Sequence, residues 1–226
     1  MISYFHKRKG ILSPCEDSLT AVVFDTLKYL PIDIFWTILK KSLIHDKLPC
    51  CSCNLVQISF WDKWDSTNTS NSNFVEPDVF LQFDDFDVII EAKRHNVGQQ
   101  LETQMRNEIQ AYFNENNEKN KQLYFIQLGG LNHRNDEADH VFGAKKVVIC
   151  KTNWTNLLEQ IVAKNNAIKE SKSSKEAAYS RILEDAIKGF ALHQYYKKRW
   201  LKDLTINSPF EIDTIGKLFP YAAKQK

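Results

Sequence analysis

A chain of 226 residues with a hydrophobic share of 43% and a charged share of 26% has the composition of an ordinary globular protein, long enough for one large domain or for a core with a helical extension. The formal net charge of +2 excludes a global basic field, so any binding of nucleic acid has to depend on local patches. The sequence shows no secretory leader and no apolar run near the ~18 residues of a membrane helix, and its five cysteines are an odd number. We therefore expect reduced thiols, a cytoplasmic location and no membrane partner.

The first element expected along the chain is a helix that begins near Ser13. Ser13, Pro14 and Glu16 are the residue types favoured at the N-cap, at the first helical position and at the third one. Apolar residues follow at helical spacing as far as about Tyr29, and Pro31 ends the pattern.

A second amphipathic segment, residues 34–43, predicts another helix, and residues 54–61 predict the first strand of a meander. Residues 62–74 are rich in Ser, Thr and Asn and predict a mobile loop. Trp61 and Trp64 at the base of this loop suit either the core or a surface on which bases stack.

The next two strands are expected to form a β-hairpin. Two runs of β-forming residues flank Asp84-Asp85, and a turn symmetric about this pair places residue i opposite residue 169 − i. Asp78 then faces Glu91, and Lys93 points to the same side of the ribbon. We expect this side to carry chemistry. The opposite side should pack in the core, because it is wholly apolar: Val79, Leu81, Phe83, Phe86, Val88 and Ile90.

The charges on this hairpin need a partner. Carboxylates at facing strand positions, here Asp78 and Glu91, repel one another, and a hard divalent cation removes that penalty. Mg²⁺ is typically held by one or two carboxylates together with water and phosphate oxygens, and Mn²⁺ is expected to substitute for it. Lys93, as an ammonium, could orient an attacking water or balance charge on a pentavalent phosphate.

A helix of about eighteen residues is expected from Gly98, and residues 122–128 then predict a buried strand. Together they give the β-α-β crossover of a parallel strand pair. A short strand at residues 145–150 and a helix over residues 152–162 follow.

Residues 165–174, rich in Asn, Lys and Ser, predict a linker, and a long helix is expected over residues 176–201. The expected organisation is a core at residues 1–164 and a helical extension at residues 165–226, packed on the same domain. The end of the last helix mixes basic and aromatic residues. Two interpretations stay open for it, a nucleic-acid patch or a cationic helix end favoured by the helix dipole, and its basic residues are Lys197, Lys198 and Arg199.

Pro77-Asp78, a gap of twelve residues and then Glu91-Ala92-Lys93 resemble the signature of the PD-(D/E)xK nuclease superfamily. The resemblance implies an α/β fold with a restriction-endonuclease-like αβββαβ core, in which helices flank a mixed central sheet. It also implies that Asp78 and Glu91 are metal ligands and that Lys93 is the catalytic lysine.

The same resemblance suggests further site residues. Members often carry an acid on the first core helix that completes the metal site, and Glu16 matches it, although a capping-box glutamate explains Glu16 equally well. A polar residue, often Gln, on the helix after the motif reaches the substrate phosphate or the site in relatives. Gln100 and Gln104 resemble this pattern, and two glutamines that merely face solvent are the alternative.

The first functional interpretation is a Mg²⁺-dependent, endodeoxyribonuclease-like enzyme that cleaves DNA in restriction, repair or phage defence, as a homodimer or with a partner subunit. The second is a catalytically silent nuclease-fold module that binds nucleic acid or docks a subunit. Degenerate members usually lose an acid or the lysine, whereas Asp78, Glu91 and Lys93 are all present here. A third is an interaction protein in which the hairpin acids are incidental.

Overall fold

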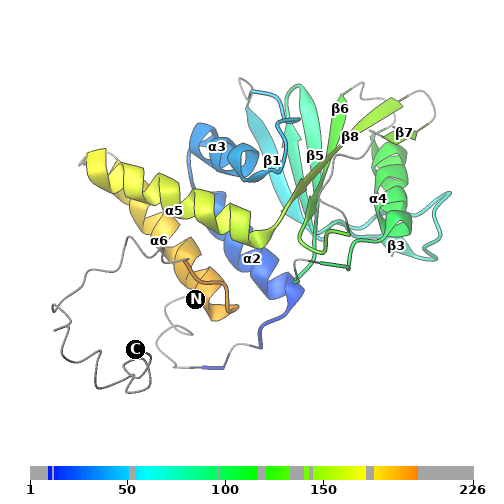
Figure 1. Cartoon of the computed structure of the whole chain (residues 1–226). Helices are drawn as coiled ribbons and strands as arrows, with labels where there is room; N and C mark the ends of the chain where they lie inside the picture. Colours follow the sequence, from blue (N-terminus) through cyan, green and yellow to red (C-terminus); the bar gives the residue numbers. More distant parts are fainter. Residues whose placement is uncertain are drawn as a thin grey trace, which may run out of the picture.

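The computed structural model describes residues 10–11, 13–50, 54–95, 97–116, 121–132, 140–142, 145–171 and 176–197, with the backbone alone for 140–142 (Figure 1). Its helices are α2 (Glu16–Leu27), α3 (Ile32–Ser42), α4 (Glu102–Glu115), α5 (Trp154–Ser171) and α6 (Ala177–Leu192). Its strands are β1 (Leu55–Phe60), β2 (Trp64–Asp65), β3 (Phe74–Val75), β4 (Val79–Phe83), β5 (Phe86–Ala92), β6 (Gln122–Leu128), β7 (His140–Phe142) and β8 (Lys145–Thr152). The predicted class, α/β with a mixed sheet between helices, is confirmed.

Six strands of the described chain form the central sheet, in the order β1-β4-β5-β6-β8-β7. Strands β1, β4 and β5 pair antiparallel, β5, β6 and β8 pair parallel, and β7 is antiparallel to β8. The hairpin of β4 and β5 has the predicted register, since Val79 pairs with Ile90 and Gln82 with Asp87. Helix α4 makes the predicted crossover between the parallel strands β5 and β6.

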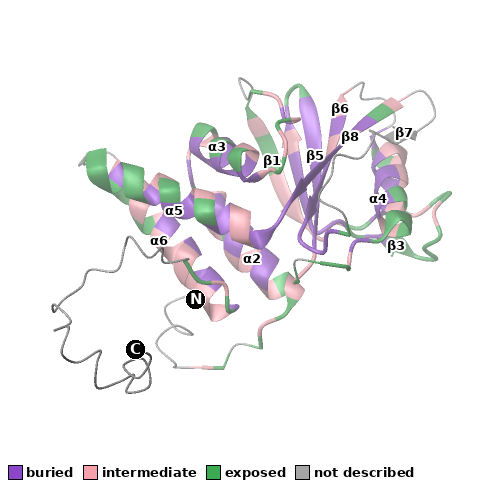
Figure 2. Ribbon diagram, in the orientation of Figure 1, coloured by how far each residue is buried: buried purple, intermediate pink, exposed green. Residues whose placement is uncertain are grey.

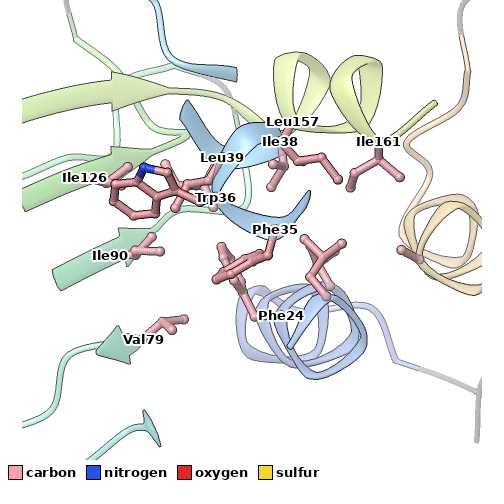
Figure 3. Packing of buried hydrophobic residues seen from close by; sticks show 14 of the residues in the cluster. Phe24, Phe35, Trp36, Ile38, Leu39, Val79, Ile90, Ile126, Leu157 and Ile161 are labelled. Atoms are coloured by element: carbon pink, nitrogen blue, oxygen red, sulfur yellow. The ribbon is translucent and has the colours of Figure 1, made fainter. Parts of the chain in front are cut away.

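The helices lie on both faces of the sheet. Helices α2, α3, α5 and α6 cover one face, and α4 with the small β2–β3 ribbon covers the other (Figure 1). On the first face, Phe24 of α2 and Phe35 of α3 belong to the same buried cluster as Val79 and Ile90 of the hairpin (Figure 3). Each amphipathic helix thus buries its apolar stripe against the predicted apolar side of the ribbon.

The other side of the hairpin is not polar along its whole length. Phe80 and Ile89 are buried there in a second cluster with residues of α4. The expectation that this side would carry only chemistry is therefore wrong. A crossover helix covers the second face of a sheet with parallel strands, so this side of the hairpin is apolar at Phe80 and Ile89 and polar at its two ends, Asp78 with Glu91 and Gln82 with Asp87.

The start of the first helix and the segment after β1 differ from the predictions. Helix α2 has Cys15 as its N-cap, so the predicted cap at Ser13 is wrong. The Sγ of Cys15 accepts a hydrogen bond from the backbone of Ser18, and the Oγ of Ser18 accepts one from the backbone of Cys15. The predicted loop at residues 62–74 contains β2 and the first residue of β3, which pair with one another.

The C-terminal part also differs in its boundaries. Helix α5 runs without a break to Ser171, so the linker predicted from residue 165 is wrong up to that residue. Helix α6 ends at Leu192 rather than at residue 201 and packs against α5 and α2. Exposed residues lie along the outward face of α5, residues of α6 are mostly half-buried or buried, and the central strands of the sheet are buried (Figure 2). No helix within the described ranges combines the length and apolarity needed to cross a membrane.

Candidate active site

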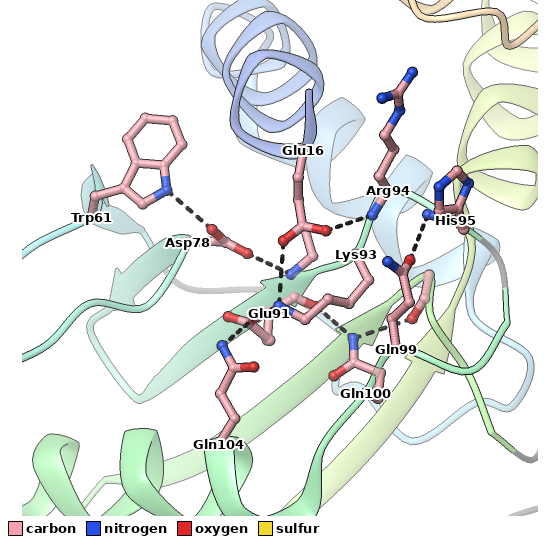
Figure 4. Close-up of polar contacts among 12 residues, drawn as sticks. Glu16, Trp61, Asp78, Glu91, Lys93, Arg94, His95, Gln99, Gln100 and Gln104 are labelled. Carbon is pink, nitrogen blue, oxygen red and sulfur yellow. Dashed lines mark hydrogen bonds and ion pairs between the residues drawn. The ribbon is translucent and has the colours of Figure 1, made fainter. Parts of the chain in front are cut away.

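Polar side chains from four separate segments meet at the carboxyl end of β5 (Figure 4). Asp78 directly precedes β4, and Glu91 and Lys93 lie at the end of β5 and just beyond it. Glu16 is the first residue of α2, and Gln104 lies in the first turn of α4. The tertiary structure therefore brings together residues that the sequence analysis selected from both helices and from the hairpin.

Asp78 is held by two donors and is almost fully buried, with 7% of its surface exposed. Its Oδ1 accepts a hydrogen bond from the indole of Trp61 at 3.0 Å, and its Oδ2 accepts one from the backbone of Ala92 at 2.8 Å. Burial and then the charge of Glu91 raise the pKa of Asp78 to about 8. The hairpin register places Asp78 opposite Glu91, and the two carboxyl groups are thus electrostatically coupled.

Glu91 is 2% exposed and shares its Oε1 between two donors. The Nζ of Lys93 and the Nε2 of Gln104, the latter at 2.6 Å, both donate to this oxygen. Burial raises the pKa of Glu91. Burial alone would lower the pKa of Lys93, but the charges of Glu91 and Glu16 outweigh it, so the pKa of Lys93 is raised and the side chain stays an ammonium.

Glu16 points toward the end of β5. Its Oε1 lies 3.4 Å from the Nζ of Lys93, and its Oε2 accepts a hydrogen bond from the backbone of Arg94 at 2.7 Å. The capping-box interpretation of Glu16 is wrong, because Cys15 and Ser18 form the cap of α2. Glu16 is therefore part of the polar cluster, and its role as a metal ligand stays a prediction.

The two glutamines have different positions. Helix α4 begins at Glu102, so Gln100 precedes it and the expectation that both lie on one helical face is wrong. Gln100 is buried, and its Nε2 donates to the carbonyls of Glu91 and Gly129, each at 3.1 Å. Gln100 thus ties the ends of β5 and β6 together, whereas Gln104 contacts the carboxylate itself. The solvent-facing alternative is wrong for both.

The backbone of Lys93 is fixed from two directions. Its N–H donates to the carbonyl of Leu128 at 2.7 Å, and its carbonyl accepts from the indole of Trp154 at 2.8 Å. Gly129 and Gly130 both have positive φ, and an added Cβ would lie 2.3 Å from the carbonyl oxygen of Lys93 at Gly129 and 2.7 Å from its Cβ at Gly130. Only glycine lets the end of β6 approach Lys93 so closely.

The sequence left two interpretations open for Trp61, and the structure gives this residue a third role. Trp64 is buried in the core, which is one of the two interpretations left open for it, but Trp61 is only partly buried and donates to Asp78. Trp61 has a left-handed backbone, with φ of 52°, and its N–H donates to the carbonyl of Pro77 at 3.1 Å. A bulky residue rarely adopts this conformation, and such positions occur often at functional sites. No local pattern signals the contact, because it depends on the pairing of β1 with β4.

Glu108 is a second residue that the sequence analysis missed. It is 1% exposed, no amide, hydroxyl or cationic group of another described residue donates to its carboxyl oxygens, and its carboxyl is hydrogen-bonded to that of Glu91. Burial and then the charge of Glu91 raise the pKa of Glu108 well above its ordinary value. Glu108 lies one helical turn after Gln104, so helical spacing could have placed both beside Glu91.

The side chains suit a hard divalent cation in their chemistry. Asp78 and Glu91 are buried carboxylates, Glu16 adds a third, and the ammonium of Lys93 offsets only part of that charge. In the described part of the chain, however, no three Asp, Glu, His or Cys side chains are grouped so as to hold a metal ion. Lys93 stands between Glu91 and Glu16, in the place where a cation would neutralise them.

The predicted basic patch is only partly within the described residues. Lys197 is exposed, shortly after the end of α6, whereas Lys198 and Arg199 lie outside the described ranges. The structure therefore gives this patch no geometry relative to the cluster around Glu91.

Comparison with known proteins identifies a relative from Pasteurella multocida. No protein-family model matches the chain, and no solved structure matches it. A protein of Pasteurella multocida (strain Pm70), named "Uncharacterized protein PM0110", is 30% identical over 220 residues, which cover 90% of this chain and 79% of that protein. That name states no activity. The chain belongs to the same family as this Pasteurella multocida protein.

Proposed function

We propose that the protein is a metal-dependent nuclease that hydrolyses phosphodiester bonds of DNA, with a restriction-endonuclease-like core. The observation that carries the proposal is the cluster of Asp78, Glu91 and Lys93 at the end of one hairpin, joined by Glu16 from the first core helix. Two buried, mutually repelling carboxylates next to an ammonium form a site that gains from a divalent cation and a phosphate.

The order of the elements supports this proposal. Helix α2, the antiparallel strands β1, β4 and β5, helix α4 and the parallel strand β6 follow one another in an αβββαβ order, with α3 and the β2–β3 ribbon as additions. The cluster lies at the edge where β5 ends and α4 begins its crossover. Sites at the carboxyl ends of sheet strands are common in α/β proteins.

In the proposed reaction, Asp78 and Glu91 would hold Mg²⁺ or Mn²⁺, with Glu16 as a third carboxylate. The cation would supply positive charge to the phosphate oxygens and lower the pKa of a bound water. The donors on Asp78 and Glu91 keep both carboxylates in fixed orientations. The ammonium of Lys93 can orient the attacking water and stabilise the charge that develops on the phosphate.

The chemistry is a substitution at phosphorus. Oxygen of the attacking water forms a new bond to phosphorus, the bond from phosphorus to the leaving sugar oxygen breaks, and that oxygen takes up a proton. The water loses its proton to solvent or to a neighbouring base. Charge therefore accumulates on the phosphate oxygens, where an ammonium such as that of Lys93 is most effective.

The test is cleavage of supercoiled and linear DNA by the purified protein with Mg²⁺ or Mn²⁺. We expect wild type to cut and both Glu91→Gln and Lys93→Met to lose at least about 100-fold in rate, because each removes charge that acts in the transition state. Glu102→Gln and Lys169→Met are matched controls on exposed surfaces of α4 and α5, and they should cut like wild type.

Two results would contradict the proposal. Equal cleavage by wild type and Lys93→Met would point to a contaminating nuclease. No cleavage of any DNA, combined with tight DNA binding by wild type, would instead favour a catalytically silent nuclease-fold module. One observation already favours that second candidate: Lys93 pairs with both Glu91 and Glu16, which satisfies these carboxylates without a metal.

A further inference from the structure

Arg94 directly follows Lys93 and has no part in the proposed reaction. Its backbone is held from two sides, because its N–H donates to Oε2 of Glu16 at 2.7 Å and its carbonyl accepts a hydrogen bond from the hydroxyl of Tyr195. These contacts join the end of β5 to the first residue of α2 and to the segment after α6. The backbone of Arg94 is therefore fixed beside the cluster around Glu91.

The side chain of Arg94 points away from that cluster, whereas the side chain of Lys93 points into it (Figure 4). Within the described part of the chain, no acceptor forms a hydrogen bond or an ion pair with the guanidinium of Arg94. The side chain is half-buried, and its nitrogens keep contact with solvent. Five N–H donors and a permanent positive charge are thus held at the surface beside the candidate active site.

The groups close to the guanidinium do not neutralise it. Burial and, to a smaller extent, the charge of Arg94 lower the pKa of His193, although the hydrogen bond to the carbonyl of Gly189 acts in the opposite direction. His193 is therefore neutral at neutral pH. Glu16 directs one oxygen to the ammonium of Lys93 and the other to the backbone N–H of Arg94. The charge of the guanidinium remains available to an external anion.

We propose that Arg94 binds a phosphate of the DNA backbone, next along the strand to the phosphate that is cleaved. The planar fork of a guanidinium matches two oxygens of one phosphate. Lys93 and Arg94 are consecutive, and their side chains point apart, so they reach different phosphates of the same strand (Figure 4). Such a contact fixes the register of the DNA without reading its sequence. The inference deepens the proposed function and rests on it.

The first experiment measures the affinity of the full chain for a short DNA duplex by fluorescence anisotropy, in the presence of a chelator. The logarithm of the affinity should fall linearly with the logarithm of the salt concentration, because bound cationic side chains release counterions from DNA. Arg94→Met should weaken binding about tenfold at low salt and make the slope shallower by about 1. Arg94→Lys should keep the wild-type slope but bind less tightly, since an ammonium lacks the planar fork.

Arg181→Met is the matched control, because Arg181 is exposed on α6, and it should bind DNA like wild type. The midpoint of urea unfolding checks for a folding defect. Arg94→Met should keep the wild-type midpoint, since both hydrogen bonds of Arg94 involve its backbone. A wild-type slope in Arg94→Met would overturn the inference, and so would the absence of salt-dependent DNA binding by wild type.

Cleavage kinetics give a second readout. Arg94→Met should raise KM about tenfold and leave kcat within about threefold of wild type, because a flanking phosphate is bound equally in the ground state and in the transition state. Lys93→Met should lower kcat instead. A lowered kcat with an unchanged KM in Arg94→Met would contradict the inference, since Arg94 would then act on the reacting phosphate.

The outcomes separate this inference from the proposed function. A shallower salt slope in Arg94→Met, without cleavage of DNA by wild type, would support the phosphate contact and remove the nuclease proposal. Cleavage that depends on Lys93, combined with wild-type affinity, slope and KM in Arg94→Met, would support the nuclease and overturn the role of Arg94.

Discussion

Three carboxyl groups, those of Asp78, Glu91 and Glu108, are buried close together, with the ammonium of Lys93 beside them. Burial is the main cause of the raised pKa of each acid, and the charge of Glu91 adds to it for Asp78 and Glu108. The folded chain therefore holds protons that the unfolded chain releases. Such an arrangement lowers the free energy of unfolding of the metal-free protein. It also makes the stability sensitive to any cation that replaces the protons.

The pH dependence of stability follows from Asp78. Its folded pKa of about 8 lies above its ordinary value of 3.8, so between these values the folded state binds more protons than the unfolded state. The contribution of Asp78 to the free energy of unfolding should thus fall as pH rises through this window, by roughly 1 kcal/mol per pH unit, and Glu91 and Glu108 add to the fall. Urea unfolding with a chelator from about pH 5 to about pH 8 measures the slope.

Asp78→Asn is the control for this prediction, since it removes one of the three raised titrations and should make the slope shallower than in wild type. Mg²⁺ should restore part of the stability at the high end of the range, because it binds the ionised carboxylates. A wild-type stability that stays flat or rises across the range would show that Asp78 does not take up a proton on folding.

At the scale of elements, the end of β6 fixes the position of Lys93. Gly130, with φ of 61°, approaches the Lys93 side chain so closely that a Cβ would lie 2.7 Å from it. Gly98 also has positive φ, 74°, but an added Cβ would meet no atom within 4 Å. Alanine substitutions at the two glycines can therefore separate the cost of backbone strain from the cost of displacing Lys93.

Gly130→Ala should destabilise the protein by more than Gly98→Ala, which carries only the left-handed backbone penalty of about 1–2 kcal/mol. Gly130→Ala should also reduce cleavage of DNA, because Lys93 has to shift, whereas Gly98→Ala should not. Urea unfolding and the cleavage assay measure the two effects. Equal losses of stability in both variants would mean that the contact with Lys93 has no energetic weight.

At the scale of the whole molecule, helix α6 is expected to unfold together with the core. Phe190 of α6 is fully buried and packs edge-on against Trp154 of α5, with ring centroids 5.9 Å apart. Trp154 in turn donates to the carbonyl of Lys93, so α6 supports the site through one intermediate residue.

Phe190→Ala should lower the free energy of unfolding of the whole described unit by about 3–5 kcal/mol, because it leaves a cavity in a shared core. Tyr196→Ala removes an exposed ring and is the matched control. Fluorescence and circular dichroism should report one common transition. If Phe190→Ala melts helical signal separately and leaves the rest at its wild-type midpoint, α6 is an independent unit.

The sequence by itself determined the elements and their local pairing. Alternating apolar residues and the Asp84-Asp85 turn set the register of β4 and β5, and the register placed Asp78 opposite Glu91. These features depend on residues close in the chain, where backbone geometry and hydrophobic periodicity leave few alternatives. The predicted start of α4 and the predicted end of α5 were wrong, because the packing of the helix ends decides where a helix begins and stops.

Only the tertiary structure decided which side chains join the hairpin. Glu16 contacts the backbone of Arg94, Trp61 contacts Asp78, and Glu108 lies against Glu91, all through packing between distant segments. The physical reason is that a helix has several faces with similar composition. The apolar core selects which face turns inward, and only that choice places the polar residues next to it.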